Sequence, residues 1–264
     1  KLLTSHISLT KHYTGEIKRD ISSSICIKDE ILHLGIKSIT TDNYIGEKEA
    51  NILEIIPSKE IKSLLSFYKN VKPIADLILL LTSFAERRRL NWYKCEGSIG
   101  LNYIENYNSK RIFHSDQEKI LLICRFEFEN YLKNCLKNIQ MKDIKYISQL
   151  IQSYLSGYEF TANAKIILWY SILDKILIKK FQEKKNKKEL LKKMGIHIDD
   201  LLPIKNLVDI RNDLAHGENV KSDRLFRLMI DWEILIERVI LKELNWNNLS
   251  MTDVAIDGIK PYGL

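Results

Sequence analysis

Cysteine, proline and glycine are all scarce in this chain of 264 residues, which contains 4 Cys, 4 Pro and 10 Gly. No two cysteines have the CxxC spacing that is typical of zinc sites and redox motifs. We therefore expect reduced thiols that pack in the interior, without a metal site, at Cys26, Cys95, Cys124 and Cys135. A hydrophobic content of 45% excludes a disordered chain. It predicts a good core in two domains, or in one domain with an elaborate N-terminal half.

Long hydrophobic runs are missing as well. The longest strongly apolar stretch, from Ile74 to Phe84, is too short to cross a bilayer and contains Asp76. The start of the chain does not have the pattern of a signal peptide. These absences predict a cytoplasmic protein without membrane association. The first residue is Lys1 rather than methionine, which leaves room for a segment before it.

The first 110 residues have the pattern of a β-rich domain with one helical segment. β-branched residues, partial alternation and intervening glycines predict short strands over Ser5–Leu9, Ser22–Ile27, Ile31–Ile39, Ala50–Ile56, Trp92–Ser98 and Leu101–Tyr107. Between them, a helical run begins at Ser58, is broken or kinked at Pro73 and continues to about Arg89. A sensing or regulatory role is the expectation for this domain.

Residues 111–264 have an almost purely helical pattern from Ser115 onward. Apolar residues recur at helical spacing in three stripes before residue 180: Leu121, Cys124, Phe128, Tyr131, Leu132, Cys135 and Ile139; Ile144, Ile147, Ile151, Tyr154 and Leu155; Ile166, Trp169, Tyr170, Leu173, Ile176 and Leu177. A last stripe comprises Leu225, Leu228, Met229, Trp232, Leu235, Ile236 and Val239. We expect an antiparallel helical bundle, with Trp169 and Trp232 in its core rather than on a base-stacking surface. The fold class is thus α+β and mostly α.

One short run, Arg211-Asn212-Asp213-Leu214-Ala215-His216-Gly217, places a cation, an amide, a carboxylate and an imidazole close together. It ends a predicted helix from Pro203 to His216, with Asp199 and Asp200 as candidate caps and Gly217 just past the end. Arg211 falls in the middle of an apolar arc of this helix that comprises Ile204, Leu207, Val208, Leu214 and Ala215.

The presence of Arg211 and His216 in one motif has two interpretations. Asn212 and His216 share one flank of the helix, and Asp213 lies one turn before the histidine. The partial negative charge of the helix end favours an imidazolium. A permanent cation and a titratable base within about 10 Å fit phosphodiester cleavage. The other reading is structural: Arg211 pairs with a carboxylate of another helix, and His216 caps the helix.

Basic residues outnumber acidic ones, 41 to 34, and they are unevenly spread. From Lys179 to Lys193 there are eight lysines and two glutamates. Such a run is either a solvent-exposed face or a positively charged surface that attracts RNA without sequence preference. In the second reading, the RNA-binding residues are Lys184, Lys185, Lys187 and Lys188.

The motif Arg211-Asn212-x-x-Ala215-His216-Gly217 resembles that of HEPN domains, the helical nucleotide-binding and ribonuclease domains of bacterial defence and toxin systems. The segment from Ala164 to Leu177 resembles the preceding helix of the ApeA-like HEPN subgroup, in which a tryptophan precedes a leucine–acid pair. Here that pair is Leu173-Asp174, and the subgroup more often has glutamate at the second position. The resemblance covers roughly residues 115 to 245.

The resemblance implies a metal-independent endoribonuclease without a cofactor. His216 would act as base or acid in the attack of the RNA 2′-hydroxyl, and Arg211 would stabilise charge on the phosphate. Asn212 would orient either group, with Asp174 or Asp213 as a supporting partner. The family further implies a homodimer with the active site at its two-fold interface, a role in abortive anti-phage defence, and a phage-derived trigger. The alternatives are an inactive helical module that binds RNA, a nucleotide or a protein, and an interaction scaffold.

Overall fold

The computed structural model describes residues 5–10, 21–27, 30–43, 46–57, 72–87, 92–99, 102–107, 122–123, 127–183, 186–196, 204–216 and 222–247. The chain divides into two compact units, Lys1–Lys145 and Tyr146–Leu264. The domain boundary expected between residues 110 and 111 lies outside the described residues and stays a prediction.

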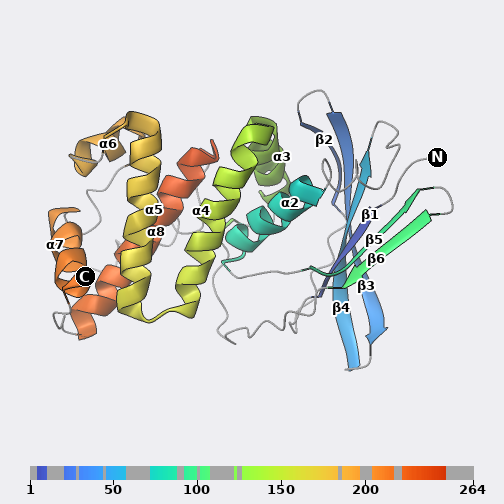
Figure 1. Cartoon of the computed structure of the whole chain (residues 1–264), viewed down its shortest axis with the longest axis horizontal. Helices are drawn as coiled ribbons and strands as arrows, with labels where there is room; N and C mark the ends of the chain where they lie inside the picture. Colours follow the sequence, from blue (N-terminus) through green and yellow to red (C-terminus); the bar gives the residue numbers. More distant parts are fainter. Residues whose placement is uncertain are drawn as a thin grey trace. The chain divides into compact units, whose positions relative to one another are not determined.

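The first unit contains an antiparallel sheet (Figure 1). Its strands are β1 (Ser5–Thr10), β2 (Ile21–Ile27), β3 (Glu30–Asn43), β4 (Gly46–Pro57), β5 (Trp92–Ile99) and β6 (Asn102–Tyr107). Their order is β2-β3-β4-β1-β5-β6, and the long β3–β4 pair runs in register from Leu32↔Pro57 to Asn43↔Gly46. β1 therefore pairs with two strands, β4 and β5, that come much later in the sequence.

Helix α2 (Lys72–Ala85) is the more buried of the two helices described in the first unit. Pro73 lies in its first turn, where a missing N–H is tolerated. The helix was expected to reach about Arg89, but it ends at Ala85, and Arg87 has a positive φ of 51°. The run predicted to begin at Ser58 lies outside the described residues up to residue 71.

Helix α3 (Phe128–Asn138) begins later than its apolar stripe predicts. Residues 122–123 form a bend, so the prediction of one helix through Leu121 and Cys124 is wrong at this point. The backbone N–H groups of Leu122 and Ile123 donate to the carbonyl oxygen of Ala85, at 2.9 and 3.3 Å. They thereby satisfy the open C-terminal end of α2 instead of extending α3.

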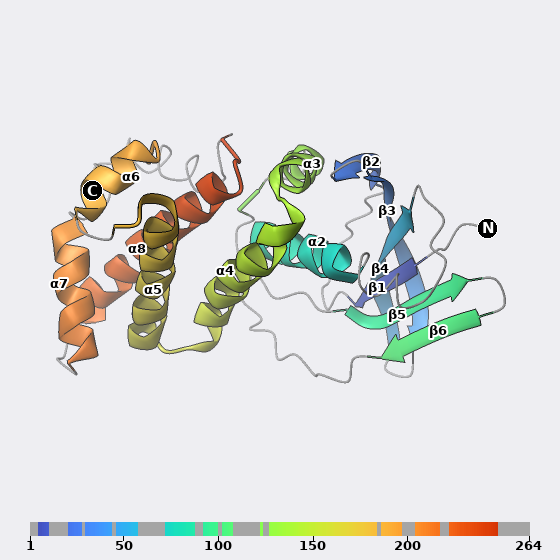
Figure 2. The ribbon, with the colours of Figure 1, turned by 45° about the horizontal axis from the view of Figure 1, so that its top comes forward.

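Most of the second unit is helical in the part that the structure describes. The short helix η1 (Met141–Asp143) ends the described part of the first unit before α4 (Ile144–Ser156), most of which belongs to the second unit. The other described helices of the second unit are η2 (Gly157–Glu159), α5 (Ala162–Phe181), α6 (Lys187–Lys193), α7 (Ile204–Ala215) and α8 (Ser222–Glu243). The prediction of a helical C-terminal part is therefore confirmed. α4 and α5 run in opposite directions on either side of η2 (Figures 1 and 2).

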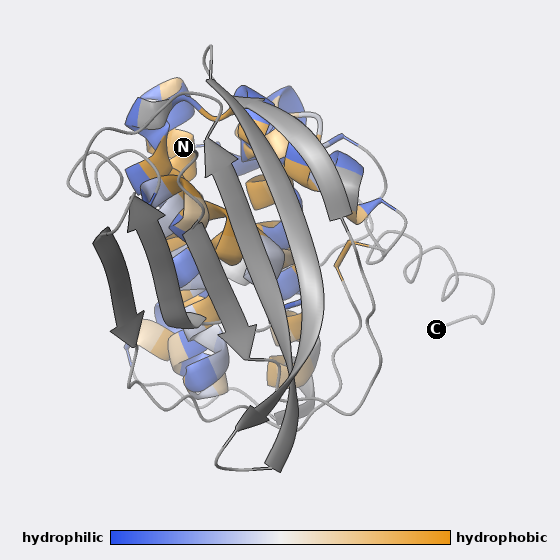
Figure 3. Ribbon diagram, turned by 90° about the vertical axis from the view of Figure 1, so that its right-hand side faces the viewer, coloured by the Kyte–Doolittle hydropathy of each residue, from blue (hydrophilic) through white to orange (hydrophobic). Residues whose placement is uncertain are grey.

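Helix α5 organises the core of the second unit, because it contacts η2, α6, α7 and α8. Trp169 and Trp232 are 0% and 1% exposed, so their prediction as core residues is confirmed. The described helices carry both hydrophobic and hydrophilic residues along their lengths (Figure 3), as expected for helices with one buried face. None of the described helices combines the length and apolarity needed to cross a membrane.

Candidate functional site

The motif helix is α7, which ends where the sequence predicts. The N–H of His216 donates to the carbonyl oxygens of Asn212 and Asp213, at 2.9 and 3.1 Å, and so closes the last turn. Leu214 is buried as expected from the apolar arc. Ala215, which shares that arc by its angular position, is exposed. A single exposed methyl group costs little. The side chains of Ile204, Leu207 and Val208 lie outside the described set.

Arg211 is partly buried and lies against an aromatic ring of α5. Its guanidinium carbon is 4.8 Å from the centroid of the Tyr170 ring, a cation–π distance. Its Nη1 donates to Oδ1 of Asn212 at 2.9 Å. Among the described residues no carboxylate forms an ion pair with Arg211, in contrast to the structural reading of this arginine.

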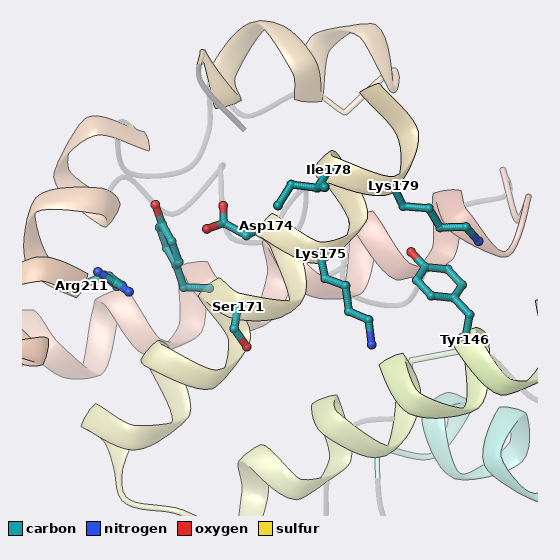
Figure 4. A pocket seen from close by; sticks show the side chains of 8 residues that line it. Tyr146, Ser171, Asp174, Lys175, Ile178, Lys179 and Arg211 are labelled. Carbon is teal, nitrogen blue, oxygen red and sulfur yellow. The ribbon is translucent and has the colours of Figure 1, made fainter. Parts of the chain in front are cut away.

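Arg211 lines a cavity of about 520 Å³ in the second unit (Figure 4). We call it the cationic cavity, and its lining residues are Tyr146, Tyr170, Ser171, Asp174, Lys175, Ile178, Lys179 and Arg211. Lys175 and Ser171 extend from α5 toward α4, which carries Tyr146. Three of these side chains are cations and one is a carboxylate, so the cavity favours an anionic ligand.

Asp174 forms an ion pair with a lysine of the lysine-rich run. Its Oδ1 is 2.7 Å from Nζ of Lys187, and the two side chains are 22% and 10% exposed. The same Nζ lies 5.1 Å from the centroid of the Tyr170 ring, which thus has Lys187 and Arg211 as neighbours. Lys188 is exposed, whereas Lys184 and Lys185 lie outside the described residues. Lys187 is therefore engaged within the protein, and Lys188 is open to solvent.

The remaining cations of the cavity surround Tyr146, which the sequence analysis did not single out. Nζ of Lys179 is 3.4 Å, and that of Lys175 5.8 Å, from the centroid of the Tyr146 ring. Lys179 also approaches Glu243 of α8 at 3.8 Å. The signal that could have identified this group is the spacing of Ser171, Lys175 and Lys179, which places them on one face of a helix.

The other predicted site residues do not line the cationic cavity. Asn212 and His216 are exposed, and Asp213 is partly exposed, on α7 and at its end. Of the predicted set, the structure brings Arg211 and Asp174 together in the cavity lining, and Lys187 pairs with Asp174. His216 lies at the exposed end of the helix that carries Arg211 and is not among the residues that line the cavity.

A second polar group, buried between η2, α4, α5 and α8, was also missed. The Tyr154 hydroxyl lies within hydrogen-bonding distance of Glu237, and the Tyr158 hydroxyl within hydrogen-bonding distance of Glu233. The two hydroxyls also lie within hydrogen-bonding distance of each other, so their two protons are shared among these three contacts. Burial raises the pKa of Tyr158 well above its ordinary value, and the nearby carboxylates add to the effect. Burial lowers the pKa of Lys165, whose Nζ lies 5.0 Å from the centroid of the Tyr158 ring.

This buried group has a visible signal in the sequence: the two tyrosines and the two glutamates each recur four residues apart, the spacing of neighbours on a helix. Glu237 is only 1% exposed, and the group links η2 and α4 to α8 through its hydrogen bonds. No group of three or more His, Cys, Asp or Glu side chains within the described ranges could hold a metal ion.

No protein-family model matches this chain. Nor does any curated protein or any solved structure match it significantly. The HEPN resemblance thus stays a prediction that rests on the motif and on the residues around it.

Proposed function

We propose that this protein is a metal-independent endoribonuclease of the HEPN type, with α7 as its catalytic helix and residues 111–264 as its HEPN-like domain. The observation that carries the proposal is the position of Arg211. It lines a cavity with two further cations, forms no ion pair with a carboxylate of the described residues, and lies on the same helix as an exposed histidine. A guanidinium placed in this way is suited to bind a phosphate group.

In the proposed reaction, the imidazole of His216 takes the proton of the RNA 2′-hydroxyl. The 2′-oxygen attacks the adjacent phosphorus, the bond from phosphorus to the 5′-oxygen breaks, and a proton is delivered to that oxygen. The products are a cyclic phosphate and a free 5′-hydroxyl. Arg211 offsets the charge that builds on the phosphoryl oxygens, and Asn212 holds the guanidinium through its hydrogen bond of 2.9 Å.

A second copy of the chain completes the proposed site. Arg211 and His216 are five residues apart on α7, about 7.5 Å along the helix axis. The exposed face formed by Asn212, Ala215 and His216 is open to a second α7. Two motifs facing each other would supply one imidazole as base and one as acid. In this proposal the dimer acts in the cytoplasm, in anti-phage defence, and a phage-derived trigger releases its activity.

One observation favours a second function. The cationic cavity does not include His216, so the same surface could bind RNA or a nucleotide without cleaving it. A binding module of this kind would show an affinity that falls steeply with salt, because each phosphate contact releases counterions. A scaffold in which Arg211 and His216 merely join helices would show neither binding nor cleavage.

Cleavage of a mixed-sequence RNA in excess chelator tests the proposal. The wild-type protein should produce fragments with cyclic-phosphate ends. Arg211→Ala and His216→Ala should each lower the rate by at least about a hundredfold, the contribution expected of a general base or a phosphate-binding cation. Lys142→Ala removes an exposed cation from the first unit and should cleave like the wild type.

The same preparations distinguish the alternatives. Folding of each variant is checked by circular dichroism before the assay. Cleavage that persists in both folded variants would contradict the assignment of Arg211 and His216. An uncut RNA that nevertheless binds in a salt-dependent way would support the binding module instead.

A further inference from the structure

A second cavity of about 520 Å³ lies on α4 and α5 in the second unit. Its lining differs from that of the cationic cavity, because amide and hydroxyl groups replace most of the charges. They come from Gln149, Gln152, Ser153 and Ser156 of α4, and Phe160 lies beside them with 52% of its surface exposed. The face of an exposed aromatic ring can stack on a nucleobase.

Lys175 joins the two cavities, because it lines both of them. Its side chain extends from α5 toward α4 (Figure 4), and its Nζ donates to Oε1 of Gln149 at 3.1 Å. We call the two cavities together the α4–α5 groove, because Lys175 lines both of them. The cationic cavity, with Arg211, is its Arg211 end, and the second cavity, with Phe160, is its Phe160 end.

The chemistry of the groove changes along its length. The Arg211 end has three cations around two tyrosine rings, and its carboxylate, Asp174, is already paired with Lys187. At the Phe160 end, Lys175 is the one charged side chain among the lining residues. Cations bind phosphates, whereas amides, hydroxyls and an exposed ring suit the edges and faces of nucleobases. The two ends together match a single-stranded nucleic acid.

We propose that the α4–α5 groove binds the single-stranded RNA that flanks the scissile phosphate, with a base stacked on Phe160 and phosphates against Lys175 and Lys179. This inference rests on the proposed nuclease function and adds the path of its substrate. From Tyr146 to Ser156, α4 rises by about 15 Å. That length accommodates roughly four stacked nucleotides, at about 3.4 Å each. Phe160 thereby makes the enzyme favour a substrate that extends several nucleotides beyond the cleaved bond.

Binding of a 2′-O-methyl RNA of about eight nucleotides tests the path, because this strand lacks the attacking hydroxyl and stays intact. Phe160→Ala should weaken its binding about tenfold, the loss expected for one stacked base. Phe226→Ala is the matched control, since Phe226 is 62% exposed on α8 outside the groove and should leave binding unchanged. A dinucleotide is too short to reach Phe160, and Phe160→Ala should not alter its binding.

A charge reversal tests the middle of the groove. Lys175→Glu should weaken RNA binding and reduce the salt dependence of that binding by about one phosphate contact. Lys137→Glu changes an exposed lysine of α3 and is the control, which should alter neither the affinity nor its salt dependence. The groove proposal is overturned if Phe160→Ala and Lys175→Glu bind RNA as their controls do. It is also overturned if the wild type binds no RNA, which would leave the groove for a protein partner.

Cleavage in chelator, measured on the same variants, separates this proposal from the nuclease proposal. If wild type cuts RNA and Arg211→Ala does not, while Phe160→Ala behaves as wild type, only the groove proposal fails. If wild type does not cut RNA but Phe160→Ala weakens binding, only the nuclease proposal fails.

Discussion

At the scale of single residues, Gly157 shows how closely the second unit is packed at its buried polar group. A Cβ atom at this position would lie 2.5 Å from Nε1 of Trp169, well inside van der Waals contact. That nitrogen donates to the carbonyl oxygen of Tyr154 at 3.2 Å, and the indole stacks on the Tyr154 ring with centroids 5.7 Å apart. Since the indole is fixed from two sides, it cannot move away from an added methyl group.

We therefore expect Gly157→Ala to lower the free energy of unfolding by about 1–3 kcal/mol, the usual cost of an overpacked core. Unfolding in urea, followed by circular dichroism, measures the change. Trp169→Phe removes the clashing atom, so Gly157→Ala should cost much less when it is made in that background. An equal cost in both backgrounds would show that the clash with Trp169 is not the cause.

At the scale of elements, an ion pair links α6 to α5, and two apolar side chains of α6 are buried. Lys187 pairs with Asp174 at 2.7 Å, and Leu190 and Leu191 are buried. The neighbouring Lys188 is exposed and faces solvent. Although both lysines belong to the run predicted to bind RNA, their surroundings give them different roles.

Lys187→Met should destabilise the protein by about 1–2 kcal/mol, because it leaves the partly buried carboxylate of Asp174 unpaired. Lys188→Met removes the same charge from the same helix and should change stability by less than about 0.5 kcal/mol. Thermal unfolding of both variants, in parallel with the wild type, makes the comparison. Equal losses would mean that the ion pair of Lys187 contributes nothing to the docking of α6.

The helices of the second unit were predictable because their apolar residues recur at one period. The stripes from Ile144 to Leu155 and from Ile166 to Leu177 fall within α4 and α5, and every residue in them is buried. The start of α3 was not predictable in the same way. It is set by hydrogen bonds from Leu122 and Ile123 to Ala85, about 37 residues earlier, and such long-range bonds leave no periodic trace in the sequence.

The candidate site was predictable only where its residues are close in sequence. Arg211 stood out because a cation interrupts an apolar arc, and Asp174 stood out through the HEPN resemblance. Tyr146 and Lys179 come together only when α4 packs beside α5, so no local pattern pairs them. Glu237 is a similar case, because a buried carboxylate is expected only once its tyrosine partner is known.

At the scale of the whole molecule, the two units differ in the buried acids that they contain. Burial raises the pKa of the Cys135 thiol well above its ordinary 9.0, and that of the Tyr131 hydroxyl well above its ordinary 10.0; both lie in the first unit. In the second unit, burial similarly raises the pKa of Tyr158. It also lowers the pKa of Lys165 below its ordinary 10.5.

These shifts predict that alkaline pH destabilises the first unit before the second. Below the ordinary pKa of each raised group, folded and unfolded chains both hold its proton, so stability does not depend on pH. As pH rises past about 9 and then about 10, the unfolded chain releases the protons of Cys135 and Tyr131 while the folded chain keeps them. The free energy of unfolding then falls, by up to about 1.4 kcal/mol per pH unit for each group.

In the second unit two groups act in opposite directions. Tyr158 lowers stability above about pH 10 in the same way as Tyr131. Lys165 raises stability as pH approaches its ordinary 10.5, because the unfolded chain still holds the proton that the folded chain has released. The second unit should therefore lose less stability over the same range of pH.

Two spectroscopic signals can follow the units separately. Three of the four tryptophans, Trp169, Trp232 and Trp246, lie in the second unit, so fluorescence reports mainly on it. Between about pH 9 and about pH 10, urea unfolding should shift to lower urea by circular dichroism more than by fluorescence. Of the three groups with raised pKa values, Cys135 has the lowest ordinary pKa. Cys135→Ala should therefore delay the onset of the alkaline loss of stability by about one pH unit. The variant also removes the contribution of Cys135 to the raised pKa of Tyr131, but burial, the largest cause of that shift, stays. An onset that stays at the same pH in this variant would rule out the thiol as its cause.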